Sequence, residues 1–508
     1  MNDILANANN SLILSLSKDE PISPMEARAS TGSARAVFFF LQKSLIRRFL
    51  FPAALIIGAV LRAAEGPVPP LPDFAPGDRV LFLSPHPDDE VLGGAGILQK
   101  ALAKGAAVRV VFLTYGDNYE GAFWAYKKHP VLEPSALRQM GELRHKEALA
   151  AGKILGLSPE DEIFLGYPDW GTLPIWLRHW AGEKPLRSML TRVTEVPYPD
   201  AYRPGAPYKG EEILRDVEAQ IREFRPTKIF VSHPADQHPD HEALYLFTAV
   251  ALWEASADVH PSVECYLVHF KNWPRPRGLH PDLALTPPMI LDGSSEWRTE
   301  SLSPKEIAVK RNALDAHHTQ RDHVPKYLFS FVRNNELFGN FPPLSLSPEG
   351  EPVPLRKGAM PPPDDGSEDL APDERERFVG LESKDVSVRD GRLVVRIVTS
   401  RSLAGAATLS VYAFGWRADK PFGEMPKLHL LFGPFRHVVR DQSRALPSSS
   451  VIVRRHPREI EVEIPLDLLG RPERILTSAR TSLLSVPLDW TAWRIVEGPA
   501  LSERSPKR

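Results

Sequence analysis

Short apolar runs alternate with longer amphipathic segments between Asp78 and Phe270. Strands separated by helices need crossover connections, and such connections join parallel strands. The alternation therefore predicts an α/β domain with a mostly parallel sheet and flanking helices. The expected strands are 80–83, 108–113, 163–165, 228–232 and 263–270, and the expected helices are 91–104, 137–155, 211–224 and 242–255.

Histidine and carboxylate side chains cluster directly after two of the expected strands. The first cluster is Ser-Pro-His-Pro-Asp-Asp-Glu at 84–90, and the second is His-Pro-Asp-His at 238–241. Sites in open α/β sheets form at the carboxyl ends of strands, so we expect the two clusters to meet. His86, Asp89 and His241 would give a metal two imidazoles and one carboxylate and leave a position for water, as in catalytic zinc sites. The sequence therefore predicts one zinc ion per chain.

The same clusters hold polar side chains that the metal does not need. Asp88 is adjacent to Asp89 and suits a general base beside a metal-bound water. His238 can present its ring to a developing oxyanion or a leaving amine, and Asp240 is expected to hydrogen-bond that ring and favour its protonated form. His233 is an alternative metal ligand. A metal that only stabilised the fold would need neither Asp88 nor His238.

These motifs resemble those of the PIG-L or LmbE-like zinc-dependent N-deacetylases. The resemblance rests on 85–90 and 238–241, extends to 144–147 and 167–169, is weaker at 310–320, and covers about residues 78–335. It implies a Rossmann-like fold in which His86, Asp89 and His241 bind zinc, Asp88 is the base and His238 stabilises the intermediate. Members of the family remove acetyl groups from N-acetylglucosamine-type amino sugars and their conjugates.

Three further residues are candidates for substrate binding: Arg144, Asp117 and Tyr208. Arg144 belongs to one of the motifs that carry the resemblance, Asp117 follows an expected strand, and Tyr208 lies in a long aromatic connection. Some relatives carry an aromatic residue before the second histidine cluster, where this chain has Asp236-Gln237. The resemblance therefore does not name the sugar.

Composition divides the chain into five parts. We expect a targeting segment at 1–64, a deacetylase domain at 65–340, a proline-rich linker at 341–376, an accessory β-sandwich at 377–500 and a tail at 501–508. The linker holds many of the 50 prolines, and such a stretch cannot bury enough apolar area to order itself. Beyond it, apolar residues alternate with a period of two, as at Leu393, Val395 and Ile397, which predicts an all-β domain.

The first 64 residues are typical of a secretory signal. Arg47-Arg48 precedes the apolar run Phe49 to Leu61, and Ala63-Ala64 offers a cleavage site. The run has about 13 residues, short of the roughly 18 that cross a bilayer. We therefore expect export to the periplasm or the extracellular space, or membrane anchoring if the signal is not cleaved. Residues 1–36 have no pattern and are consistent with a start codon further downstream.

Aromatic residues are frequent in two places outside the motifs. The connection 170–210, which includes Trp170, Trp176 and Trp180, is expected to be an ordered flap over the site, or else a surface excursion packed on the sheet edge. In the C-terminal domain, Trp416, Trp490 and Trp493 are expected either to pack in a core or to form a platform that stacks on glycans.

Composition also excludes several classes of function. A net charge of −2 argues against a general nucleic-acid binder. The single cysteine, Cys265, excludes an intrachain disulfide and a cysteine-rich zinc site, and we expect it to be a buried strand residue. The run Gly93-Gly94-Ala95-Gly96 lacks the spacing of a dinucleotide-binding motif.

The sequence therefore predicts an exported zinc-dependent N-deacetylase with an accessory β domain. Its partner is an N-acetylated sugar or glycoconjugate, with no nucleic acid and no stable membrane partner after cleavage. Two alternatives stay open: a non-catalytic glycan-binding protein with a structural metal, and a metal-dependent amidase acting on a non-sugar amide. The oligomeric state has no signal in the sequence.

Overall fold

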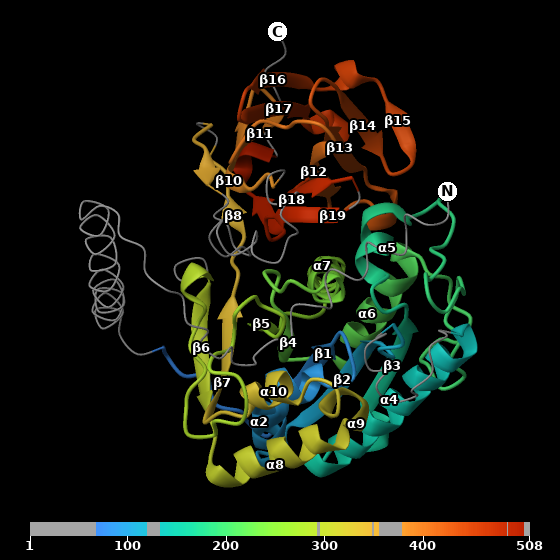
Figure 1. Ribbon diagram of the computed structural model, residues 1–508, viewed down its shortest axis with the longest axis vertical. Coiled ribbons are helices and arrows are strands. Elements are labelled where there is room, and N and C mark those ends of the chain that lie inside the picture. The colour runs from blue at the N-terminus through green and yellow to red at the C-terminus, as the bar shows by residue number, and fades with distance from the viewer. Residues whose placement is uncertain are drawn as a thin grey trace, which may run out of the picture. The chain divides into compact units, whose positions relative to one another are not determined.

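The computed structural model describes residues 68–118, 133–291, 295–347, 350–354, 378–484 and 486–501 (Figure 1). The chain divides into two compact units, Met1–Pro69 and Pro70–Arg508, and every element described below belongs to the second. The expected targeting segment lies outside the described residues. Within the described ranges, the helices are all too short or too polar to cross a membrane.

A seven-stranded mixed sheet forms the centre of the N-terminal half of this unit, in the order β3-β2-β1-β4-β5-β7-β6. The first five strands of the sequence pair in parallel, whereas β7 is antiparallel to both β5 and β6. The strands are β1 (Arg79–Ser84), β2 (Ala107–Thr114), β3 (Glu162–Tyr167), β4 (Lys228–Ser232), β5 (Ser262–Tyr266), β6 (Glu296–Ser301) and β7 (Asn335–Asn340).

The five parallel strands confirm the sequence prediction: most of their residues are apolar and buried, as expected for strands covered on both faces. The strand expected at 263–270 ends earlier, at Tyr266. The antiparallel strands were not predicted. Residues 296–301 in β6 are Glu-Trp-Arg-Thr-Glu-Ser and only Trp297 is buried, so neither an apolar run nor an alternation marks them as a strand.

Helices cover both faces of the sheet (Figure 1). One face carries α2 (Asp89–Ala103), α4 (Pro134–Leu155) and α8 (Pro304–Ala316), and the other carries α5 (Thr172–Arg178), α6 (Gly210–Phe224) and α7 (Pro239–Glu254). Two short helices, α9 (His318–Arg321) and α10 (Pro325–Leu328), follow α8. In α6 the residues expected on one face, Ile213, Val217 and Ile221, are all buried, as the amphipathic pattern predicts.

The site is positioned by the reversal of strand order between β1 and β4. From β1 the chain passes through α2 to β2 on one side, and from β4 it passes through α7 to β5 on the other. A crevice opens at the carboxyl ends of two strands that diverge in this way. The first histidine cluster follows β1 and the second follows β4, so both clusters reach this crevice.

The C-terminal part is built from two mostly antiparallel sheets that enclose one hydrophobic core, with β8 and β20 as a parallel pair. The five-stranded sheet has the order β16-β17-β11-β10-β9, and the eight-stranded sheet has the order β15-β14-β13-β12-β18-β20-β8, with β19 paired to β18. Leu393, Val395 and Ile397 all point into the core, as their alternation predicts. The strands of the first sheet are β9 (Val353–Pro354), β10 (Leu381–Arg389), β11 (Arg392–Thr399), β16 (Ile452–His456) and β17 (Glu459–Pro465). Those of the second are β8 (Leu344–Ser345), β12 (Ala407–Trp416), β13 (Lys427–Phe432), β14 (His437–Asp441), β15 (Arg444–Leu446), β18 (Arg474–Leu483), β19 (Val486–Trp490) and β20 (Arg494–Glu497).

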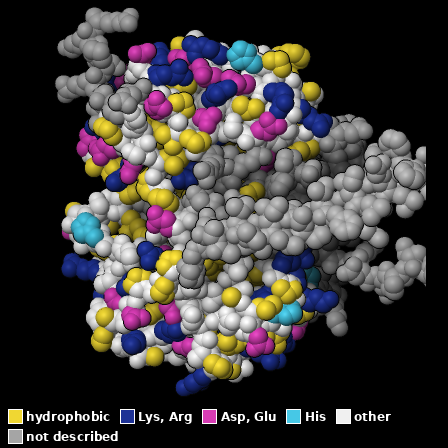
Figure 2. All heavy atoms as spheres, turned by 90° about the vertical axis from the view of Figure 1, so that its left-hand side faces the viewer, with side chains coloured by type: hydrophobic (Ala, Val, Ile, Leu, Met, Phe, Trp, Pro, Cys, Tyr) yellow, Lys and Arg dark blue, Asp and Glu magenta, His cyan; other side chains and the backbone are white. Residues whose placement is uncertain are grey.

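Charged pairs cover the solvent side of the five-stranded sheet. Arg454 lies 2.7 Å from Glu461, and Arg396 lies 2.7 Å from Glu459. Basic and acidic side chains intermingle over the β-rich part in Figure 2. Exposed pairs of this kind add little to stability, so their contribution is to keep this face solvated.

The expected linker is wrong in its first part. Leu344–Ser345 forms β8, which pairs with β20, and Val353–Pro354 forms β9, which pairs with β10. Both lie at sheet edges, where proline is tolerated because its missing N–H faces away from the ladder. Partners distant in sequence therefore order a stretch that composition alone marks as unstructured. Residues 355–377 and 502–508 lie outside the described part of the chain.

Aromatic side chains join the two halves of this unit. Trp176 in α5 packs against Phe247 of α7, with ring centroids 5.0 Å apart, and against Phe422 and Trp493 of the β-rich part, at 5.3 and 6.2 Å. Trp180 packs edge-on against Phe422 at 5.1 Å. The flap prediction is therefore wrong for most of the 170–210 connection, because Trp176 and Trp180 fill this junction and do not cover the site.

The C-terminal tryptophans contribute to the same packing. Trp493 and Trp416 are buried, and the Trp416 ring lies 5.3 Å from Trp253 of α7. This confirms the core-packing alternative for these two residues. A glycan-stacking surface cannot use side chains that are closed between two halves of one unit.

We expect Trp176→Ala to lower the free energy of unfolding by about 3–5 kcal/mol, the usual cost of truncating a buried aromatic side chain. Phe435→Ala is the matched control, since Phe435 is 98% exposed and its loss should change stability by less than about 0.5 kcal/mol. Chemical denaturation followed by circular dichroism measures both. Equal stability of the two variants would contradict an energetically important junction.

Candidate metal centre

The first cluster is a tight turn between β1 and α2. Ser84 Oγ donates to the carbonyl of His86 at 2.7 Å, and the N–H of His86 donates to Asp89 Oδ2 at 3.0 Å. Asp88 has φ 137° and ψ −25°, a conformation that costs about 1–3 kcal/mol outside glycine. Its N–H donates to Glu90 Oε2 at 2.9 Å. The turn thus holds the Asp88 carboxylate in a fixed, strained position at the start of α2.

The second cluster opens α7. His238 is the N-cap, and its Nδ1 accepts the N–H of Asp240 at 3.2 Å. His241 lies one residue further along, with its Nδ1 3.1 Å from Asp236 Oδ2. The Asp236 carboxylate also accepts the backbone N–H groups of Val268 and His269, each at 2.9 Å. Asp236 therefore fixes one ring nitrogen of His241 and leaves Nε2 facing the first cluster.

The three predicted ligands meet. His86 Nδ1 lies 3.2 Å from Asp89 Oδ2, and His241 Nε2 lies 3.1 Å from the same oxygen. With His269 they form a group whose ligand atoms all lie within 4.8 Å of one another. Asp89 Oδ1 is buried without a hydrogen-bond partner among the described residues. A buried, unpartnered carboxylate oxygen beside two imidazoles fits a divalent metal, which would replace the lost solvation.

A second group shares His86. His86 Nε2 lies 3.2 Å from Asp169 Oδ1 and 3.2 Å from Asp240 Oδ2, and these three residues with His238 also have ligand atoms within 4.8 Å. Neither Asp169 nor His269 was predicted to take part. Their signal in the sequence is their position, since Asp169 follows β3 and His269 follows β5, at the same sheet edge as the two clusters.

Burial sets the protonation of the two candidate acid–base groups. It raises the pKa of Asp88 to about 7, against the opposing charge of Arg144, whose Nη2 lies 3.6 Å from Asp88 Oδ1. Burial also lowers the pKa of His238 well below its usual range, and the neighbouring imidazoles of His86 and His269 add to that effect. At neutral pH His238 is therefore an uncharged imidazole.

The expected role of Asp240 is wrong. Its carboxylate accepts the N–H of Trp170 at 2.6 Å, the N–H of Thr172 at 3.1 Å and the Thr172 hydroxyl. Asp240 Oδ2 is 3.9 Å from His238 Nδ1, too far for a hydrogen bond, and that nitrogen already accepts a backbone N–H. Asp240 thus ties the loop after β3 to α7 and does not favour a protonated His238.

Two of the three candidate substrate residues are engaged inside the protein. Arg144 donates to the carbonyl of Pro87 at 2.8 Å and to that of Gly116 at 3.0 Å, so it holds the turns after β1 and β2 together. Tyr208 is completely buried beside Tyr167, with ring centroids 6.4 Å apart. The structure shows both side chains buried within the protein, and their expected contact with a substrate stays a prediction.

The third candidate for substrate binding, Asp117, follows β2, and the alternative metal ligand, His233, follows β4. Asp117 is buried and accepts the hydroxyl of Tyr198, and burial raises its pKa to about 7. His233, the alternative ligand, belongs to neither metal group. Its Nδ1 accepts the N–H of Ala235 and its Nε2 lies 2.9 Å from Ser295 Oγ.

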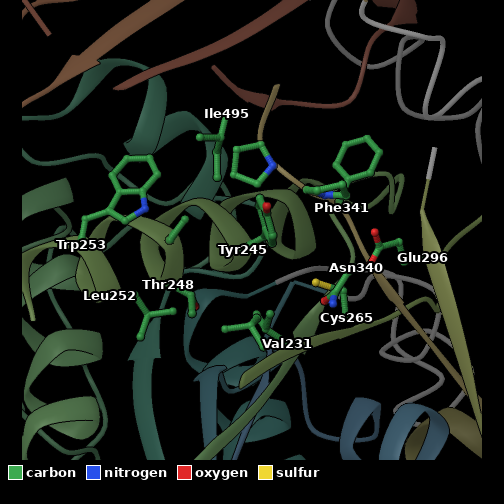
Figure 3. Close-up of a pocket in the computed structure, with 14 residues that line it drawn as sticks. Val231, Tyr245, Thr248, Leu252, Trp253, Cys265, Glu296, Asn340, Phe341 and Ile495 are labelled. Atoms are coloured by element: carbon green, nitrogen blue, oxygen red, sulfur yellow. The ribbon is translucent and has the colours of Figure 1, made fainter. Parts of the chain in front are cut away.

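A separate cavity of about 330 Å³ lies between α7, residues of β5 and β7, and Ile495 of β20 (Figure 3). Its lining is mostly apolar and includes Tyr245 and Cys265, but no residue of the two metal groups. Cys265 is buried, and burial raises the pKa of its thiol. This confirms a packing role for Cys265 and places the cavity outside the chemistry of the cluster.

The part of the chain that contains both histidine clusters is similar to a known protein family. The model of PIG-L, described as GlcNAc-PI de-N-acetylase, matches residues 81–252, which include both histidine clusters. In this region, about a third of its length, the chain is similar to the PIG-L family. The segment runs from β1 to α7 and so contains the strands that bring the clusters together.

Curated relatives carry related names. A 1D-myo-inositol 2-acetamido-2-deoxy-alpha-D-glucopyranoside deacetylase of Mycobacterium sp. (strain KMS) is 29% identical over 213 residues, which are 42% of this chain and 61% of that protein. A mycothiol S-conjugate amidase of Streptomyces coelicolor is 26% identical and aligns over 54% of this chain and 84% of its own. Among solved structures, an N,N'-diacetylchitobiose deacetylase from Pyrococcus horikoshii is 18% identical, with a TM-score of 0.32, covering 52% of this chain and 83% of that one.

Removing a predicted ligand should remove the metal. We expect His241→Ala to lower the affinity for a divalent metal by at least about 10–100-fold, because it deletes one of the three expected ligands. His260→Ala is the control, since His260 is exposed and belongs to neither group. Metal content after equilibrium dialysis reports the difference, and equal metal in the two variants would rule out this centre.

Proposed function

We propose that this chain is a zinc-dependent hydrolase that removes an N-acetyl group from an N-acetylglucosamine-type amino sugar or conjugate. The proposal depends on one observation: the three expected ligands converge in the β1–β4 crevice, with Asp88 and His238 beside them. The family description and the name of the mycobacterial relative, a deacetylase of an acetamido sugar, support the substrate class.

His86, Asp89 and His241 would hold the zinc. When bound, zinc supplies a Lewis acid and lowers the pKa of a bound water to about 7. The second group then has an orienting role, because Asp169 and Asp240 lie on the Nε2 side of His86 while Asp89 lies on the Nδ1 side. Carboxylates on the far nitrogen of a liganding imidazole fix its tautomer and its direction.

Asp88 takes the proton from the attacking water. Its carboxylate has a pKa of about 7, which suits a base that must both accept and release a proton near neutral pH. Arg144 limits how far burial can raise that pKa, and its guanidinium lies 3.6 Å from the Asp88 carboxylate.

His238 stabilises the developing oxyanion as a neutral donor. Its Nδ1 accepts a backbone N–H, so the proton of the uncharged ring is on Nε2. That N–H can donate to an oxygen whose negative charge grows in the transition state, without first having to bind a proton.

We also infer the finer fold classes. The parallel order β3-β2-β1-β4-β5 supports a Rossmann-like core, and two mostly antiparallel sheets around one hydrophobic core support a sandwich. Both sheets of the β-rich part contribute residues to that single core, which is the arrangement that defines a sandwich.

A second candidate is a metal-dependent amidase acting on a non-sugar amide. The name of the Streptomyces coelicolor relative, mycothiol S-conjugate amidase, favours it. A non-catalytic glycan-binding protein is less well supported, because a structural metal would need neither a strained carboxylate at Asp88 nor a neutral imidazole at His238. Acetate release from N-acetylated sugars and from simple N-acetyl amides by the zinc-loaded protein separates the three.

We expect Asp88→Asn to lower kcat by about 100-fold or more and to keep the zinc, since an amide accepts no proton but preserves the shape of the turn. Acetate release and metal content measured on one preparation test both halves. Loss of zinc in this variant would mean that Asp88 and Asp89 have exchanged roles. Unchanged kcat would remove Asp88 from the mechanism.

Export is a separate proposal, supported by the basic, apolar and Ala-Ala segments between Lys43 and Ala64. We expect the mature protein to begin near Ala64 or Glu65. N-terminal sequencing after expression in a secreting host gives the answer, and a protein that retains Phe49 to Leu61 in the cytoplasmic fraction would contradict it.

A further inference from the structure

Trp170 is an exposed aromatic residue at the rim of the metal centre. Its side chain is 43% exposed, and its ring meets the His238 ring at 62°, with centroids 4.5 Å apart. The preceding residue, Asp169, belongs to the second metal group. An aromatic side chain therefore lies partly in solvent and partly against the imidazole that we assign to the oxyanion.

The backbone of Trp170 is in the left-handed region, with φ 60°. Its N–H donates to Asp240 Oδ2, and the carbonyl of Asp169 accepts the Asn118 side chain at 3.3 Å. The next residue must be small, because a Cβ on Gly171 would lie 2.6 Å from Pro168 Cγ. Contacts on both sides thus hold this turn in one conformation.

Such an arrangement is unfavourable for folding alone. A non-glycine residue in the left-handed region costs about 1–2 kcal/mol. Apolar area left in water also loses the stabilisation of about 25 cal/mol per Å² that burial would give. Trp176 and Trp180, a few residues later, are fully buried against other aromatic rings. The chain therefore buries neighbouring tryptophans completely and leaves Trp170 open at the site, a pattern that indicates ligand contact.

We propose that Trp170 is a stacking platform for the pyranose ring of the substrate. One face of a pyranose presents C–H groups, and its rim presents hydroxyls. The C–H face can pack on a flat, rigid aromatic ring while the hydroxyls at the rim stay hydrated. A ring seated on Trp170 has its N-acetyl group beside His238. This inference rests on the proposed function and deepens it, because it assigns recognition of the sugar ring to one side chain.

Two substrates with the same amide separate ring recognition from chemistry: methyl N-acetylglucosaminide, which has the ring, and N-acetylethanolamine, which lacks it. We expect Trp170→Ala to raise KM for the glycoside about tenfold and to leave kcat/KM for N-acetylethanolamine unchanged. Trp170→Phe keeps an aromatic face and should stay within about threefold of the unchanged protein. Phe435→Ala, at an exposed aromatic residue of the β-rich part, is the control and should leave KM and kcat/KM unchanged for both substrates.

Equal loss of kcat on both substrates, or loss of zinc, would overturn the platform and show that Trp170 positions His238 instead. Unchanged KM for the glycoside would also overturn it.

A binding measurement keeps this inference distinct from the proposed function. In the Asp88→Asn background, calorimetry with methyl N-acetylglucosaminide should give a Kd about tenfold weaker when Trp170→Ala is added. If the zinc-loaded protein releases no acetate, the proposed function fails. The calorimetric comparison still tests whether Trp170 binds the sugar ring. Equal Kd values with and without Trp170→Ala would refute it.

Discussion

The site depends on the direct pairing of β1 with β4. Val80, Leu81 and Phe82 lie in parallel register with Lys228, Ile229 and Phe230, and the two strands carry the chain into α2 and α7 on opposite sides. Since both strands end at the same edge, turns separated by about 150 residues of sequence share one buried volume. Asp89 then lies between two imidazoles that no local interaction could bring together.

Much of this could be predicted from sequence because the signals are local. Most residues of the buried parallel strands are apolar, and the candidate metal ligands His86, Asp89 and His241 come shortly after two of these strands. What escaped prediction depends on partners distant in sequence. The edge strand β9 includes Pro354 and is ordered only by β10, and His269 reaches the cluster only because β5 lies beside β4. Periodicity carries no information about such neighbours.

The acid–base assignments show the same limit. Sequence spacing suggested that Asp240 would serve His238, because only one residue separates them. In the folded chain the Asp240 carboxylate accepts hydrogen bonds from the N–H groups of Trp170 and Thr172, and burial keeps His238 neutral. The competition for Asp240 comes from the loop after β3, whose approach is a property of the sheet order and not of the motif.

Helix α7 has a consequence for how distant parts of the chain influence each other. Its first turn presents His241 to the metal centre, and its 16 residues extend about 24 Å. At its far end Glu254 accepts the N–H of Phe422 at 3.0 Å, and near its start Glu242 lies 3.6 Å from Arg480 of β18. Contacts near both ends join the helix to the β-rich part. A shift of that part would therefore tilt the helix and move His241. Substitutions in the β-rich part that change these contacts would therefore be expected to change the position of His241 without altering any residue of the two metal groups.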